Sequence, residues 1–73
     1  MKYKTDLEMI LKAILQKTEP LVSEVRISDD GVLAVIKIGE KYMPRRLSPL
    51  GKRFLRSGSE VELAEDESFL EPE

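Results

Sequence analysis

The spacing of apolar residues near the start of the chain predicts an amphipathic helix over residues 5–18. In this stretch apolar side chains recur every three or four positions, which places them on one side of a helix. They are Leu7, Ile10, Leu11, Ile14 and Leu15. Thr5 and Glu8 have the spacing of a capping box, and Pro20 cannot continue a helix. We expect the apolar side to pack on a sheet or on another copy of itself.

An Asp-Gly pair between two alternating stretches predicts a β-hairpin over residues 21–38. Asp30 and Gly31 supply the two positive-φ positions that a tight turn requires. Counting outward from the turn gives the facing pairs Asp29–Val32, Ile27–Ala34, Val25–Ile36 and Ser23–Ile38. On the opposite face Arg26 lies across from Val35 and Glu24 from Lys37. We therefore expect Val25 and Ile36 to be buried together.

The pattern after the hairpin predicts a short helix and then a third strand. Pro44 interrupts the next stretch, and no strand is predicted there. Ser48 followed by Pro49 is typical of a helix start, which predicts a helix over 49–57. Apolar and acidic residues alternate over 60–64, which predicts an antiparallel strand.

These elements together predict a small α+β fold. We expect one domain over residues 1–64, in which the first helix packs on the antiparallel sheet. Residues 65–73 form an acidic C-terminal tail, ordered or disordered, in which Phe69 and Leu70 are the one apolar spot. A domain of this size buries only about 60–65% of the surface of its unfolded chain, so its stability margin is thin. A homodimer is one way to add stability, and we expect one.

The composition of the chain excludes several classes of protein. It has no cysteine and no histidine, so it has neither the soft ligands of a zinc finger nor the commonest general base. Ser48 is better explained as a helix cap than as a nucleophile, and the Asp29–Asp30 pair as a turn. We expect no enzymatic activity, no metal and no cofactor. No apolar run approaches the roughly 20 residues that cross a bilayer, so a cytoplasmic protein without a membrane partner is expected.

Charge is separated along the sequence although the net charge is only −2. Residues 37–56 hold seven bases and one acid, whereas residues 60–73 hold seven acids and no base. Such asymmetry concerns partners and solubility rather than fold. The acidic tail either covers the basic segment, binds a basic partner or only solvates the domain.

The basic segment over residues 41–56 is the candidate site. Its cations are Lys41, Arg45, Arg46, Lys52, Arg53 and Arg56. Clustered cations bind nucleic-acid phosphates, and the planar fork of arginine suits bidentate contacts. Tyr42 is either a base-stacking residue or an aromatic of the core or rim. The sequence favours a small regulatory protein that binds DNA or RNA. The alternatives are a solvated, ion-paired surface and a protein-interaction module, an adaptor or inhibitor, that uses its charged halves or apolar helix.

Two short motifs resemble the AbrB/MazE-type (SpoVT-AbrB) DNA-binding family. Residues 43–47 read Met-Pro-Arg-Arg-Leu, and residues 58–63 read Gly-Ser-Glu-Val-Glu-Leu. The resemblance covers residues 39–70. It implies an obligate dimer whose DNA-facing residues are Lys41, Arg45, Arg46 and Lys52.

Overall fold

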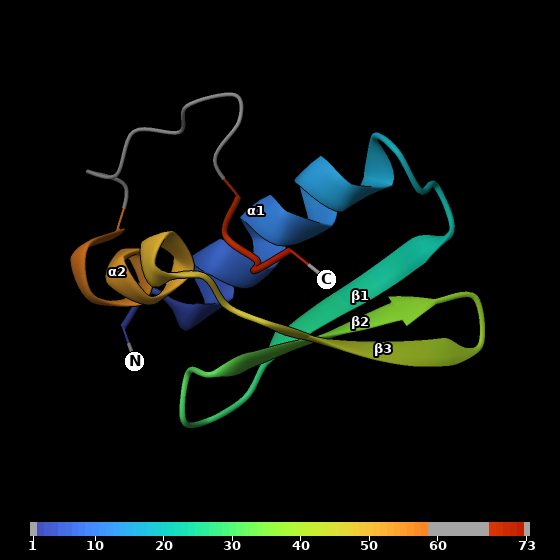
Figure 1. Ribbon diagram of the computed structural model, residues 1–73. Helices are drawn as coiled ribbons and strands as arrows, with labels where there is room; N and C mark the ends of the chain where they lie inside the picture. The colour runs from blue at the N-terminus through green and yellow to red at the C-terminus, as the bar shows by residue number, and fades with distance from the viewer. Residues whose placement is uncertain (1, 59–67, 73) are drawn as a thin grey trace.

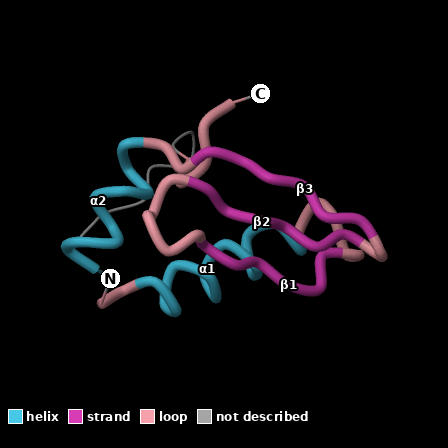
Figure 2. The backbone as a smooth tube through the Cα atoms, turned by 90° about the horizontal axis from the view of Figure 1, so that it is seen from below, coloured by secondary structure: helices cyan, strands magenta, loops and turns pink. Residues whose placement is uncertain are grey.

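The computed structural model describes residues 2–58 and 68–72, which form two helices and one sheet (Figure 1). In chain order the elements are α1 (Lys4–Gln16), β1 (Val22–Ile27), β2 (Leu33–Ile38), β3 (Lys41–Arg46) and α2 (Pro49–Ser57). The strands are antiparallel, and β2 lies between β1 and β3 (Figure 2). Figure 1 shows α1 above the sheet, α2 to the left beyond the ends of the strands, and no helix below the sheet. The α+β class is confirmed, while the strand predicted at 60–64 lies outside the described residues.

The helix α1 forms where the apolar spacing predicted it, but its start differs. Tyr3 occupies the N-cap position without a side-chain hydrogen bond, and Thr5 lies within the first turn. The predicted capping box is therefore wrong. Glu8 instead accepts a hydrogen bond from the backbone N–H of Ile27 at 2.8 Å. Because β1 is an edge strand, the N–H of Ile27 has no neighbouring strand to bind on that side, and the Glu8 carboxylate takes the place of such a strand.

The register of the hairpin agrees with the sequence prediction over most of its length. The observed pairs Glu24–Lys37, Val25–Ile36, Arg26–Val35 and Ile27–Ala34 are those predicted. Val25 and Ile36 are both buried, with 5% and 2% of their surface exposed. At the far end of β1 the register shifts, so that Val22 rather than Ser23 lies opposite Ile38.

The turn itself is wider than the two-residue turn that the sequence predicted. The N–H of Ser28 donates to the carbonyl of Leu33 at 2.8 Å, which leaves four residues in the loop. Gly31 has a φ of 72°, but Asp30 has a negative φ. The carboxylate of Asp30 accepts hydrogen bonds from the Ser28 hydroxyl and the Val32 N–H. These bonds lower the pKa of Asp30 below its ordinary value of 3.8.

The strand β3 forms despite Pro44, contrary to the sequence pattern. Leu47 donates its N–H to the carbonyl of Val32 at 2.9 Å. Because bonding positions alternate along an antiparallel strand, the nitrogen of Pro44 faces away from β2. A proline is tolerated at such a position on an edge strand, since no donor is needed there.

The helix α2 has the bounds and the cap that the sequence predicted. The Ser48 hydroxyl accepts a hydrogen bond from the N–H of Gly51 at 3.2 Å, and Pro49 is the first helical residue. Gly58, with a φ of 70°, ends the helix. Gly51 lies so close to the C-terminal segment that a Cβ there would stand 2.4 Å from the carbonyl oxygen of Phe69. The glycine is therefore required by packing.

The C-terminal segment 68–72 packs against the start of α2 and the end of β3. The Ser48 N–H donates to the Phe69 carbonyl, and the Glu71 N–H donates to the Arg46 carbonyl, both at 2.8 Å. Leu70 forms an antiparallel bridge with Leu47. Two residues that the sequence pattern grouped with the acidic tail thus belong to the fold.

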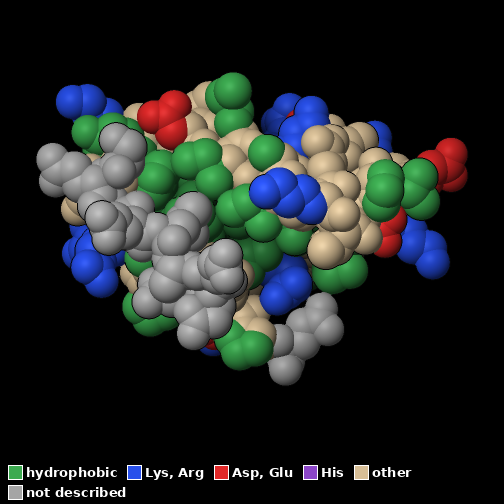
Figure 3. All heavy atoms as spheres, turned by 90° about the horizontal axis from the view of Figure 1, so that it is seen from above, with side chains coloured by type: hydrophobic (Ala, Val, Ile, Leu, Met, Phe, Trp, Pro, Cys, Tyr) green, Lys and Arg blue, Asp and Glu red, His purple; other side chains and the backbone are tan. Residues whose placement is uncertain are grey.

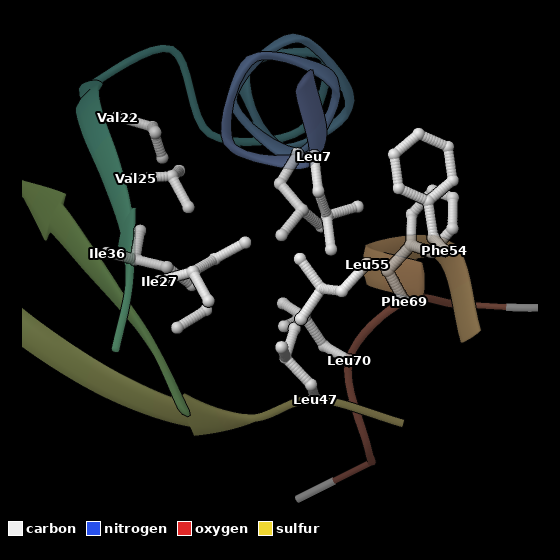
Figure 4. Close-up of a cluster of buried hydrophobic side chains, with 12 residues drawn as sticks. Leu7, Val22, Val25, Ile27, Ile36, Leu47, Phe54, Leu55, Phe69 and Leu70 are labelled. Carbon is white, nitrogen blue, oxygen red and sulfur yellow. The ribbon is translucent and has the colours of Figure 1, made fainter. Parts of the chain in front are cut away.

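A single cluster of buried side chains joins the helices, the sheet and this segment (Figure 4). Phe69 and Leu70 expose only 2% and 4% of their surface. The ring of Phe69 meets that of Phe54 edge to face, with centroids 5.3 Å apart. The other members are Leu7, Leu11, Val22, Val25, Ile27, Ala34, Ile36, Leu47 and Leu55. The core therefore holds α2 and its cations in a fixed position.

Candidate nucleic-acid interface

The six predicted phosphate-binding residues lie on two neighbouring elements. Lys41, Arg45 and Arg46 belong to β3, and Lys52, Arg53 and Arg56 belong to α2. Lys41 begins β3 at the end away from α2, about 17 Å along the strand from Arg46. The structure therefore keeps Arg46 near the helix and places Lys41 apart.

The basic side of α2 is formed by Lys52, Arg53 and Arg56. All three residues are exposed, whereas Phe54 and Leu55 point into the core. With 3.6 residues per turn, the three cations fall within about 100° of arc. Among the residues that the structure describes, no carboxylate forms an ion pair with any of them. Figure 3 shows Lys and Arg side chains around the end of the molecule where α2 lies.

Arg45 has a structural contact that the sequence did not indicate. Its register position opposite Ala34 places it on the core side of the sheet. Its Nη2 donates to the carbonyl of Glu71 at 2.8 Å, and the residue is half-buried. Arg45 therefore ties the C-terminal segment to β3.

The part of the chain that the structure describes is basic. It contains all twelve lysines and arginines but only eight of the fourteen acids. Residues 2–58 and 68–72 thus carry a net charge of about +4, in contrast to −2 for the whole chain. An anionic ligand is attracted to a surface of this charge.

A shallow hollow of about 360 Å³ lies between α2 and the turn of the hairpin. Lys52 and Arg56 line it on the helix side, and Asp30 and Val32 line it on the turn side, with Leu55 as a further wall. The carboxylate of Asp30 offsets part of the positive charge at this place. The more strongly basic surface is therefore on the outer side of α2, toward Arg53.

The face of the sheet opposite the helices is a second surface of interest, which the sequence pattern did not indicate. Its side chains are Glu24, Arg26, Leu33, Val35, Lys37, Tyr42, Pro44 and Arg46. Tyr42 is 64% exposed, and Lys37 places its Nζ 5.7 Å from the centroid of the Tyr42 ring. Arg26 donates a hydrogen bond to Glu24 and thereby lowers the pKa of that carboxyl. We call this surface the outer face.

The residues of the outer face come from three separate segments of the sequence, so no single local pattern indicates this face. The hairpin register sets Lys37 and Val35 on one face, and Tyr42 follows four residues after Ile38. Only the pairing of β2 with β3 brings Tyr42 beside Lys37. Since no strand was predicted around Pro44, this face could not be assembled from the sequence.

Comparisons with family models, with curated proteins and with solved structures yield no match to this chain. The residues described contain no cluster of three or more metal-ligating side chains. Neither described helix is long and apolar enough to cross a bilayer. The functional argument therefore rests on the basic side of α2 and on the outer face.

Proposed function

We propose that the protein is a small regulatory protein that binds nucleic acid without catalysing a reaction. One observation carries the proposal: Lys52, Arg53 and Arg56 share an exposed side of a helix whose other side is fixed in the core. Because the backbone of the helix is already ordered, only the side chains of these cations lose entropy when they meet phosphates. Arg46 is close to α2 along the chain, but its side chain lies on the outer face of the sheet, and Lys41 lies farther along the same strand.

Arg45 has an indirect part in this proposal. Because its guanidinium binds the carbonyl of Glu71, it stabilises the segment that packs against α2. The resemblance of residues 39–70 to the AbrB/MazE-type family supports the same class of function. The same resemblance implies that the protein binds nucleic acid as a dimer.

A homodimer is supported by the size of the chain and by apolar residues on the surface of α1. Met9 and Ile14 are 67% and 38% exposed. A second copy would remove such surface from water and stabilise both chains. Sedimentation at high micromolar concentration should give a mass near twice 8.3 kDa. A mass of one chain under these conditions would contradict the dimer.

The experiment that tests nucleic-acid binding is a titration of labelled DNA and RNA at several salt concentrations. With about four phosphate contacts, the log–log slope of affinity against salt should be near −3.6 for duplex DNA. Arg53→Gln should flatten the slope by about one unit and weaken all sequences alike. Lys12→Gln, which removes an exposed charge from α1, is the matched control. Equal losses of affinity for both variants would show that binding depends only on net charge, which would contradict a site on α2.

A protein-interaction module is the second candidate, and one observation favours it. An apolar hollow of about 260 Å³ on α1 is lined by Asp6, Met9, Ile10 and Phe54. An exposed apolar site of this kind suits a side chain of a partner. If the protein binds neither DNA nor RNA at low salt, this second function takes the place of the first.

A further inference from the structure

The outer face is an ordered array of side chains at a regular spacing. Its three cross-strand rows are Glu24–Lys37–Tyr42, Arg26–Val35–Pro44 and Leu33–Arg46. Successive rows are about 7 Å apart, because each step spans two residues of a strand. Every row carries one cation. A surface with positive charges in successive rows suits an extended anionic chain better than a compact ligand.

Tyr42 differs from the other aromatic residues of the chain. Phe54 and Phe69 are buried, and Tyr3 packs edge to face on Phe54 with ring centroids 6.5 Å apart. Tyr42 is instead 64% exposed and lies on the edge strand. The ammonium group of Lys37, at 5.7 Å from the ring centroid, is within the range of a cation–π contact. A positive charge is therefore held beside an accessible ring.

The charges of the outer face indicate the kind of ligand. Glu24 is the only acid in the three rows, and it is paired with Arg26. Lys37 and Arg46 form no ion pair within residues 2–58 and 68–72, so the face is complementary to an anion. Val35 and Leu33 are half-buried, so the exposed apolar surface between the cations comes mainly from Tyr42 and Pro44. A nucleobase needs only one accessible ring face, and the exposed ring of Tyr42 supplies it.

We propose that the outer face binds single-stranded nucleic acid, with a base stacked on Tyr42 and phosphates on Lys37 and Arg46. A duplex cannot present its bases in this way because they are stacked within the helix, whereas a single strand can. This inference rests on the proposed function and adds the class of nucleic acid. It uses a surface distinct from the basic side of α2.

The first test compares a labelled 12-nucleotide oligo(dT) with a duplex of the same length. Tyr42→Ala should weaken binding of the single strand by about 5- to 150-fold, which corresponds to stacking of one base. It should leave duplex binding nearly unchanged. Tyr42→Phe should retain wild-type affinity because it keeps the ring. Leu21→Ala is the matched control, since Leu21 is 66% exposed and lies before β1, outside the three rows.

The second test uses the fluorescence of Tyr42 and does not depend on a truncating variant. The chain has two tyrosines and no tryptophan, so Tyr3→Phe leaves Tyr42 as its one strong fluorophore. Stacking on a base should quench this emission, with the same dissociation constant that the labelled oligo(dT) gives. Duplex DNA should leave the emission unchanged.

The outcomes separate the two proposals. Single-strand binding without quenching, or with wild-type affinity in Tyr42→Ala, overturns the role of the outer face but leaves binding through α2 intact. Preference for the duplex overturns it as well. If neither nucleic acid binds at low salt, the proposed function fails and the inference fails with it.

Discussion

The packing of Phe69 predicts that a single substitution in the C-terminal segment 68–72 will severely destabilise the domain. Phe69→Ala removes a ring that is 2% exposed and that meets the ring of Phe54 edge to face. Truncation of a buried phenylalanine costs about 3–5 kcal/mol, and the edge-to-face pair favours the upper part of this range. A domain of this length has a total stability of about 4–11 kcal/mol. The variant should therefore be marginally stable or unfolded.

Urea unfolding followed by far-ultraviolet circular dichroism measures this effect. The wild type and the variant should have similar m-values, with the midpoint of the variant shifted strongly to lower urea. Leu21→Ala is the control, since Leu21 is 66% exposed and its loss should change the stability by less than about 0.5 kcal/mol. A loss below about 1 kcal/mol for Phe69→Ala would refute the conclusion that this residue belongs to the core.

Three further predictions follow from the described contacts. Ile36→Ala should cost about 2–5 kcal/mol in urea unfolding, because Ile36 is buried in the centre of the sheet, and a loss below 1 kcal/mol would argue against this. Gly51→Ala should lower the urea midpoint although alanine is favoured in helices by about 1 kcal/mol, since its Cβ would meet the Phe69 carbonyl; a raised midpoint would contradict the contact. The pKa of Asp30 is lowered mainly by the Ser28 hydroxyl, so the stability that Asp30 contributes is present above pH 3.8 and is lost as the pH falls through its lowered pKa. Ser28→Ala should shift the NMR titration midpoint of Asp30 upward, and an unchanged midpoint would exclude this cause.

The burial of Phe69 and Leu70 also changes how the acidic residues should be tested. Deletion of residues 65–73 would remove the acids, but it would also remove Phe69 and Leu70 from the core. A loss of nucleic-acid binding would then have two explanations. Replacement of Glu65, Asp66 and Glu67 by glutamine removes three charges and keeps both core residues. If these acids compete with phosphates, the substituted protein should bind more tightly.

The elements that could be predicted from the sequence are those governed by local spacing. The helix α1, the register of the hairpin and the cap of α2 at Ser48 depend on residues close together in the chain. The strand β3 was missed because Pro44 removes a donor, and only the sheet shows that this donor would face away from β2. The hydrogen bond from Ile27 to Glu8 was missed because it joins residues 19 apart.

Only the part of the candidate site that depends on local spacing could be predicted from the sequence. The residues Lys52, Arg53 and Arg56 share one side of α2 because helical geometry alone requires it. The contact of Arg45 with Glu71 spans 26 residues, and no local pattern indicates it. The outer face likewise depends on strand pairing, which the sequence around Pro44 did not reveal.

The bridge between Leu47 and Leu70 has a consequence for the order in which the chain folds. The hairpin joins residues close in sequence, so its loop closes with a small loss of chain entropy. The bridge closes a loop of more than twenty residues and forms with the bonds made by Ser48 and Glu71. During synthesis the hairpin leaves the ribosome well before Leu70, so we expect an early hairpin and a late closing step. Substitutions in the C-terminal segment should then accelerate unfolding more than they slow folding.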